Sequence, residues 1–387
     1  MTHRPDDLSL MQQALQWAEQ AIGQCEPNPR VGCVITCTDG QLLGRGHTQA
    51  AGSAHAEVMA LRDAQARGHS VRGGCVHVTL EPCAHHGRTP PCCDALIAAG
   101  VARVVIAVQD PFPQVAGQGA ARLRAAGIEV EFGPLAEAAE ALNIGFFSRV
   151  RRGRPWLRLK SAVSLDGRTA LPNGVSQWIT GAAARTDGHT WRKRAGALLT
   201  GIGTVRDDNP RLDVRLVDIA RQPLRVIVDS RLETPLQARI LEAPGPVLIY
   251  AADAAAVGDA ARVDALRQRG AEIVALPGPG GKVDLAAMLI DLGGRGINEL
   301  HVEAGHKLAG SLVSAGLVDE FLIYMAPRLL GSGHGPASFG PLQRLQDAPL
   351  LRFTSVTTIG DDLRILARPV PAEPGTAPTA TATASGR

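Results

Sequence analysis

The chain has 387 residues, 45% of them hydrophobic and 20% charged, which predicts a globular protein of two or three domains. It contains neither a run of about 18 apolar residues nor an apolar signal core, so we expect no membrane span or membrane partner, and a cytoplasmic location. The net charge is +3, but residues 1–150 carry 11 Arg, no Lys and 14 Asp or Glu, a charge of −3 that disfavours nucleic acid as a partner.

The first 145 residues alternate helix and strand patterns. Helices are predicted at about 8–22, 55–68, 95–100 and 120–127, and strands at 31–37, 41–47, 75–80, 102–108 and 128–132. This alternation is typical of an α/β sheet with helices on its faces.

The second half repeats the same alternation after the segment 146–156, where a basic run, Gly153 and Pro155 mark the predicted domain boundary. We therefore predict domains at 1–147 and 154–368. Strands are expected at 156–161, 198–205, 224–230, 246–251, 272–276, 299–304 and 320–326. The Pro-, Ala- and Thr-rich tail, residues 369–387, is expected to be disordered.

All seven cysteines, at positions 25, 33, 37, 75, 83, 92 and 93, lie in the first 93 residues. An odd number of cysteines in one part of a large chain does not indicate a disulfide framework. We assign Cys25, Cys33, Cys37 and Cys75 to the core and expect a reducing compartment.

The remaining cysteines stand with a histidine in a pattern that suits zinc. His55, Cys83 and one of Cys92 or Cys93 supply three ligands, and a catalytic zinc site leaves its fourth position to water. Glu57, two residues after His55, can take a proton from water and return it to a leaving amine. This pattern of His-x-Glu, then Pro-Cys and a second Cys, is that of zinc deaminases of nucleobases.

Alternatives to this zinc site remain open. A closed structural site would take a fourth ligand from His85 or His86, but it would leave Glu57 without a role. His47 and His77 lie on strand patterns, so we expect satisfied core or edge histidines there.

The spacing of the paired ligands departs from the usual signature, because eight residues separate Cys83 and Cys92 instead of two. The insertion carries His85, His86 and Arg88, which suit a polar or phosphorylated substrate.

Signals for a cofactor in the second half are weaker. The stretch "ELHVEAGHKLAGSL" predicts strand, glycine turn and helix, either a phosphate-binding turn or an ordinary tight turn. A strand ends at Ser230 and Arg231, a suitable place for the extra phosphate of NADP. Basic residues outnumber acidic ones between 185 and 215, and two or three of them can hold a substrate phosphate.

Longer stretches carry a specific resemblance: "PNPRVGCVI", "HAEVMAL", "TLEPCAHHGRTPPCCDALIAAGV", "VQDPFPQVAGQG", "LKSAVSLDGRTA", "SQWITG" and "HVEAGHKLAGSLVSAGLVDE". They resemble the RibD family of bifunctional riboflavin-biosynthesis proteins, in which a pyrimidine deaminase is fused to a reductase. The resemblance covers nearly the whole chain except the tail. It implies an α/β fold with an N-terminal cytidine-deaminase-like domain and a C-terminal dihydrofolate-reductase-like domain.

The resemblance also implies roles for single residues. The zinc ligands would be His55, Cys83 and Cys92, and Glu57 would be the catalytic proton shuttle. NADPH would contact Ala162, Trp178, Thr204, Asp208, Ser230, Gly305, His306, Lys307, Leu308, Ala309, Gly310 and Ser311. The substrate would contact Ser176, Arg192, Leu212, Arg215 and Glu303. Val175 departs from the family's usual glutamate, and "RDDNP" from its usual Asp-Asp-Pro.

The implied function is zinc-dependent hydrolytic deamination of 2,5-diamino-6-(5-phosphoribosylamino)pyrimidin-4-one, followed by NADPH-dependent reduction of the ribosyl side chain to ribityl. The partner is this phosphorylated pyrimidine, and a homo-oligomer is expected. One rival is a nucleic-acid base deaminase, disfavoured by the acidic first half with only five aromatic residues. A second rival is a zinc-stabilised binding protein that senses NADP without turnover.

Overall fold

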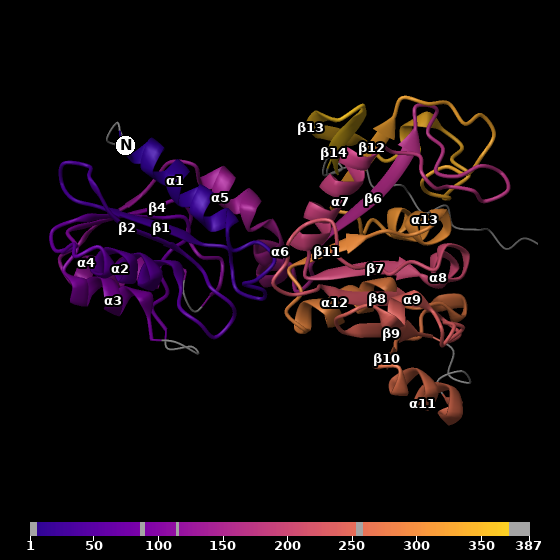
Figure 1. Ribbon diagram of the computed structural model, residues 1–387, viewed down its shortest axis with the longest axis horizontal. Coiled ribbons are helices and arrows are strands. Elements are labelled where there is room, and N and C mark those ends of the chain that lie inside the picture. Colours follow the sequence, from indigo (N-terminus) through magenta and orange to yellow (C-terminus); the bar gives the residue numbers. More distant parts are fainter. Residues whose placement is uncertain (1–5, 86–89, 114–115, 253–257, 371–387) are drawn as a thin grey trace, which may run out of the picture. The chain divides into compact units, whose positions relative to one another are not determined.

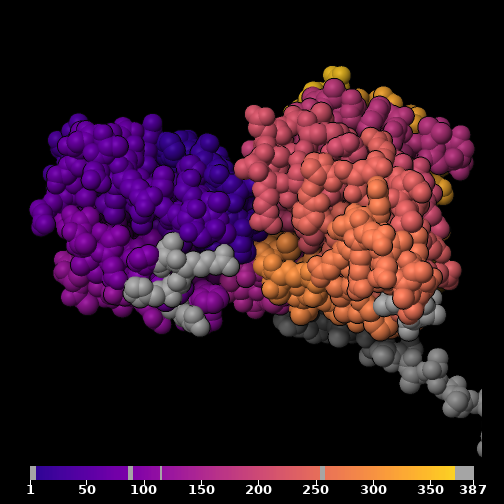
Figure 2. Space-filling view, turned by 60° about the horizontal axis from the view of Figure 1, so that its bottom comes forward, coloured from indigo at the N-terminus to yellow at the C-terminus, as the bar shows by residue number. Residues whose placement is uncertain are grey.

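The computed structural model of the chain describes residues 6–85, 90–113, 116–252 and 258–370, and the other residues are grey in Figures 1 and 2. The chain divides into two compact units. The first comprises Met1–Leu157 and Arg185–Gly305, and the second comprises Arg158–Ala184 and the chain from His306 onward. His86, Arg88 and all but the first two residues of the predicted tail lie outside the described residues.

A mixed five-stranded sheet forms the centre of the first 150 residues. Its strands run in the order β2 (Leu42–His47), β1 (Gly32–Thr36), β3 (Cys75–Val78), β4 (Arg103–Ile106) and β5 (Glu129–Phe132). Strand β1 is antiparallel to both β2 and β3, whereas β3, β4 and β5 are parallel. This arrangement confirms the predicted α/β sheet.

Helices cover both faces of this sheet (Figure 1). On one face are α1 (Asp7–Glu19) and α5 (Ala136–Leu142), which pack Met11 and Ala139 against Val34 and Val105. On the other face are α2 (Ala56–Ala66), α3 (Cys92–Ala99) and α4 (Gln118–Ala125). The start of α2 and the start of α3 therefore lie on the same side of the sheet, which positions the candidate metal ligands.

The predicted boundary segment is mostly helical. Helix α6 (Ile144–Arg152) buries Phe146 and Phe147, and Gly153 ends it with a positive φ of 70°. The two compact units divide the chain at other positions, so the domain limits 1–147 and 154–368 remain a prediction.

A parallel sheet follows in the first unit. Its order is β10 (Ala271–Ala275), β9 (Val247–Ala251), β8 (Leu224–Val228), β7 (Ala197–Gly201) and β11 (Glu299–Val302). Around it lie α7 (Ala182–Arg194), α8 (Ile202–Asp208), α9 (Arg239–Glu242), α11 (Ala260–Gln268) and α12 (Leu285–Gly294). The predicted strand 198–205 was wrong after Gly201, because the chain turns there into α8.

The second unit contains β6 (Trp156–Ser164), β12 (Glu320–Ala326), β14 (Asp362–Pro369) and β13 (Leu351–Ile359), in that order, and helix α13 (His306–Ser314). Strands β6 and β12 are parallel, and β12, β14 and β13 are antiparallel. Across the parallel pair, the buried Arg158 Nε donates to Glu320 Oε2 at 2.6 Å. No described helix has both the length and the apolar character needed to cross a membrane.

Candidate functional site

Three candidate zinc ligands converge beside the first sheet. His55 is the N-cap of α2, Cys92 opens α3, and Cys83 follows β3. One ligand atom from each of these residues lies within 4.8 Å of the other two. The Nδ1 atom of His55 is 3.7 Å from the Cys83 sulfur and 3.3 Å from the Cys92 sulfur. Two sulfurs and an imidazole nitrogen are a donor set that zinc favours.

The start of α3 favours a thiolate in this cluster. The backbone N–H of Cys92 donates to the Cys83 sulfur at 3.3 Å. A hydrogen bond from the Cys92 thiol, followed by one from His55, lowers the pKa of Cys83 to about 4, although burial opposes this shift. The Cys83 hydrogen bond in turn raises the pKa of His55. The residues present therefore fit a bound cation.

The neighbouring cysteine lies outside the cluster. The buried Cys93 thiol donates to the carbonyl oxygens of Pro82 at 3.4 Å and Gly119 at 3.6 Å. The structure thus brings Cys92 to His55 and turns Cys93 into the core. His85, one of the two alternative fourth ligands, is exposed and stacks on Phe112 with 6.3 Å between the ring centroids.

Glu57 lies in the first turn of α2, close to the candidate ligands. Its side chain is only 3% exposed. Burial raises the pKa of its carboxyl group, and the negative charge of Cys83 raises it further, whereas His55 opposes the shift. A carboxyl group held this close to the ligand cluster can accept a proton and return it.

Two acidic residues that sequence reasoning missed support this site. The buried Glu81 carboxylate accepts from the backbone N–H groups of Gly117 and Ala120, both at 3.0 Å, at the start of α4. It therefore fixes the segment that leads to Cys83. Burial first, and then the charges of Glu81 and Cys83, raise the pKa of Asp110 to about 6. Glu81 lies in the stretch "TLEPCAHHGRTPPCCDALIAAGV" and Asp110 in "VQDPFPQVAGQG". Their position in these two stretches, which carry the family resemblance, was the only signal in the sequence that pointed to them.

His47 and His77 have the structural settings that we expected, whereas only two of the four cysteines assigned to the core are fully buried. Nε2 of the buried His77 is 2.9 Å from Oδ1 of Asp7, and His47 stacks on Trp17. Cys25 and Cys33 are buried, Cys37 and Cys75 are partly buried, and all seven cysteines are free thiols.

Several candidate cofactor contacts of the first unit lie where neighbouring parallel strands end. Thr204 follows β7, Ser230 follows β8, and Gly305 follows β11, whose partner is β7. The Gly305 N–H donates to Oγ1 of Thr204 at 3.1 Å. Open α/β sheets bind ligands outside the carboxyl ends of their strands, so these residues fit a bound nucleotide. Asp208, at the end of α8, is exposed.

Four of the five candidate substrate contacts lie together in the first unit. Arg192, on α7, binds both carboxylate oxygens of Glu303, at 2.5 and 3.0 Å. Its Nη1 also donates to the carbonyl oxygen of Asp213 at 2.8 Å. Leu212 is buried with a φ of 48°, a conformation that is uncommon for leucine and typical of constrained functional loops. Arg215 donates to the Asp213 carboxylate at 2.6 Å.

The remaining candidates lie in the second unit. Ala162 is on β6, Ser176 and Trp178 are in the loop that follows it, and His306–Ser311 open α13. Trp178 is 59% exposed, and its carbonyl oxygen accepts from Arg328. A Cβ on Gly310 would meet the carbonyl oxygen of Ser338 at 1.8 Å, so close packing requires this glycine. This glycine of α13 therefore has a structural reason.

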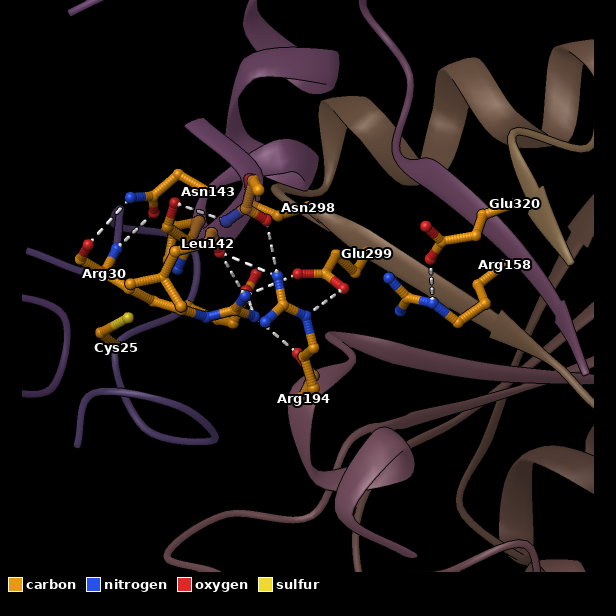
Figure 3. Close-up of polar contacts among 12 residues, drawn as sticks. Cys25, Arg30, Leu142, Asn143, Arg158, Arg194, Asn298, Glu299 and Glu320 are labelled. Carbon is orange, nitrogen blue, oxygen red and sulfur yellow. Dashed lines mark hydrogen bonds and ion pairs between the residues drawn. The ribbon is translucent and has the colours of Figure 1, made fainter. Parts of the chain in front are cut away.

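A buried network of ion pairs joins the two sheets of the first unit (Figure 3). The sequence did not predict this network. Arg30 donates to Glu299 Oε1 at 2.6 Å, and Arg194 donates to Glu299 Oε2 at 2.8 Å. Both guanidinium groups also donate to the carbonyl oxygen of Leu142, at 3.0 and 2.9 Å. Asn143 exchanges two hydrogen bonds with the backbone of Arg30.

Known families match both halves of the chain. Residues 155–365 match the family described as RibD C-terminal domain. Residues 4–108 match the family described as cytidine and deoxycytidylate deaminase zinc-binding region.

Similar proteins cover almost the same length. The riboflavin biosynthesis protein RibD of Escherichia coli is 44% identical over 369 residues, which span 91% of this chain and 96% of that protein. RibD of Bacillus amyloliquefaciens is 41% identical, over 93% of this chain and 95% of that protein.

Solved structures agree with these matches. Acinetobacter baumannii RibD, form 1, has a TM-score of 0.84 at 39% identity, over 95% of this chain and 99% of that chain. A Thermotoga maritima protein described as a diaminohydroxyphosphoribosylaminopyrimidine deaminase/5-amino-6-(5-phosphoribosylamino)uracil reductase has a TM-score of 0.81 at 32% identity, over 94% of this chain and 99% of that chain.

Proposed function

The chain belongs to the RibD family of bifunctional riboflavin-biosynthesis proteins, and from this premise we propose the roles of its individual residues. It is a bifunctional enzyme with a cytidine-deaminase-like zinc-binding deaminase domain and a dihydrofolate-reductase-like, NADPH-dependent reductase domain. The deaminase acts on 2,5-diamino-6-(5-phosphoribosylamino)pyrimidin-4-one, and the reductase then converts the ribosyl side chain to ribityl.

In the deaminase, His55, Cys83 and Cys92 hold Zn²⁺, which activates water and stabilises negative charge when it is bound. Glu57 takes a proton from the attacking water and delivers it to the amino group, which leaves as ammonia. The observation that carries this proposal is the convergence of three ligand atoms within 4.8 Å, with the buried Glu57 carboxyl in the adjoining helical turn.

In the reductase, Arg192, Leu212, Arg215 and Glu303 hold the phosphorylated substrate, together with Ser176. Glu303 orients Arg192 through a two-pronged ion pair, which suits a planar guanidinium that must meet a phosphate. NADPH supplies the reducing equivalents. Its proposed contacts are Thr204, Asp208, Ser230 and Gly305 in the first unit, and Ala162, Trp178 and His306–Ser311 in the second.

Zinc analysis coupled to an ammonia assay tests the deaminase. We expect one zinc per chain and ammonia release from the diaminopyrimidine phosphate, with both lost after chelation. NADPH oxidation with the deaminated product tests the reductase. A protein that binds NADPH without oxidising it in the presence of this product would contradict the proposal and favour a sensor.

We further propose that the enzyme is a homo-oligomer. Strand β13 ends the strand order of the second unit among the described residues, and it exposes Phe353 and Val356. An apolar edge strand favours pairing with another chain. Sedimentation should give a multiple of the chain mass, and Phe353→Lys should lower it. A monomer at micromolar concentration would contradict this proposal.

We also propose a cytoplasmic location, supported by the seven free thiols. Fractionation of cells that express the chain should recover it with cytoplasmic markers, and recovery with exported proteins would contradict this location.

A further inference from the structure

His189 is a buried histidine among the proposed substrate contacts of the reductase, and it has no assigned role. It lies on α7 one helical turn before Arg192, and its side chain is only 4% exposed. The backbone N–H of Arg215 donates to its Nδ1 at 3.1 Å. A neutral imidazole has one acceptor nitrogen and one N–H group. Because Nδ1 accepts, the proton is on Nε2.

The Nε2–H group faces another donor. Its polar neighbour is Nη1 of Arg192 at 3.4 Å, which already donates to the carbonyl oxygen of Asp213. Two N–H donors therefore converge, and among the described residues Nε2 has no acceptor in this contact. Buried donors are rarely left without an acceptor, so this position suits an oxygen atom supplied by a ligand.

The charges around the ring keep it neutral. Burial first, and then the guanidinium groups of Arg192 and Arg215, lower the pKa of His189 to about 4, although Glu303 and Asp213 oppose the shift. The ring therefore carries one N–H at neutral pH, and that N–H points toward Arg192. A neutral donor beside two cationic groups suits an anionic oxygen.

We propose that His189 is a substrate-binding residue, whose Nε2–H donates to a phosphate oxygen of the substrate held between Arg192 and Arg215. Its Nδ1 also anchors the loop that contains Leu212 and Arg215. This inference rests on the proposed reductase function, and it names a residue that recognises the phosphate group. The second role alone would make His189 purely structural, so an experiment must separate the two nitrogen atoms.

Two substitutions separate them. Asparagine places its side-chain oxygen near the position of Nδ1, so His189→Asn keeps the acceptor for Arg215 and removes the donor. Glutamine places its amide nitrogen near Nε2, so His189→Gln keeps the donor. We expect His189→Asn to weaken binding of ribose 5-phosphate by roughly tenfold to a hundredfold, and His189→Gln by only a few-fold. NADPH affinity, the control for an intact domain, should not change in either variant.

A second measurement uses the unsubstituted full-length enzyme, so its result does not depend on whether a variant folds. Addition of ribose 5-phosphate should shift the Nε2–H signal of His189 in nuclear magnetic resonance spectra and leave Nδ1 unprotonated. Unchanged ribose 5-phosphate affinity in His189→Asn, equal losses in both variants, or no shift of the Nε2–H signal would each overturn the inference. If the enzyme binds the probe through His189 but does not oxidise NADPH with the deaminated substrate, the proposed function fails while the inference stands.

Discussion

Arg30 and Glu299 are 269 residues apart in sequence, yet they form an ion pair at 2.6 Å that is almost completely buried. Arg30 lies just before β1 of the first sheet, and Glu299 opens β11 of the second. Glu299 also binds Arg194 on α7, the helix that carries Arg192. The pair therefore connects the sheet beside the zinc cluster with the strand and helix that position Glu303 and Arg192.

We expect Glu299→Gln to lower the free energy of unfolding by about 3 kcal/mol, because Arg30 and Arg194 would lose the buried carboxylate that they share, and Arg30 would keep only its longer pair with Glu26. The matched control is Glu233→Gln, since the pair of Glu233 with Arg206 is exposed and should contribute less than about 1 kcal/mol. Urea unfolding of the full chain measures both variants. Equal stability losses in the two variants would show that burial of the pair does not matter.

The same ion pair bears on the independence of the two halves. The sequence predicts that fragments of about 1–147 and 150–387 each keep their own chemistry, because the zinc ligands precede residue 94 and the suspected cofactor contacts follow residue 160. We expect activity per folded molecule to persist in both fragments, but each to be less stable than the full chain, because cleavage separates Arg30 from Glu299. If the second fragment binds NADPH only after the first is added back, the domain limits are wrong.

Glu57→Gln should keep the bound zinc and the fold, because glutamine has nearly the same size, but it cannot carry the proton. Ammonia release should fall by roughly a hundredfold to ten-thousandfold, while NADPH oxidation with the deaminated substrate persists. Near-parental ammonia release would exclude Glu57 as the proton shuttle.

Cys92→Ser should lose most of the zinc, because a hydroxyl group is a poor replacement for a thiolate. Cys93→Ser is the matched control and should retain the metal, since its thiol donates to the carbonyl oxygens of Pro82 and Gly119 and lies outside the ligand cluster. Zinc content per chain, measured by atomic emission, decides between the two cysteines. Equal loss in both variants, or the reverse order, contradicts the assignment of Cys92.

The sequence predicted most strands and the neighbourhood of the zinc cluster, because periodic apolar residues and short-range motifs are local signals. The spacing of the residues could not show whether Cys92 or Cys93 is the zinc ligand. The two cysteines are adjacent at the start of a helix, and only the geometry of the first helical turn decides in which direction each side chain points. The Arg30–Glu299 pair was out of reach, because tertiary folding alone brings these residues together. The hairpin of β13 and β14 was missed because many of its residues are exposed, so its apolar pattern is weak.

The buried Asp7 makes stability depend on pH. The guanidinium of Arg103 first, and then His77, hold the pKa of Asp7 well below its usual range, although burial opposes them. A carboxyl group with a lowered folded-state pKa stabilises the fold above its unfolded pKa of about 4, and this contribution is lost as the pH falls toward the folded value. Burial also lowers the pKa of His77, so acid destabilises the fold through both groups.

We expect the free energy of unfolding to fall on acidification, and Asp7→Asn to reduce the slope of this free energy against pH below about pH 4. Asp63→Asn, which alters the more exposed pair with Arg67, is the control and should keep the parental slope. Urea unfolding at several pH values measures all three proteins, and a parental slope in Asp7→Asn would contradict the role of this carboxylate.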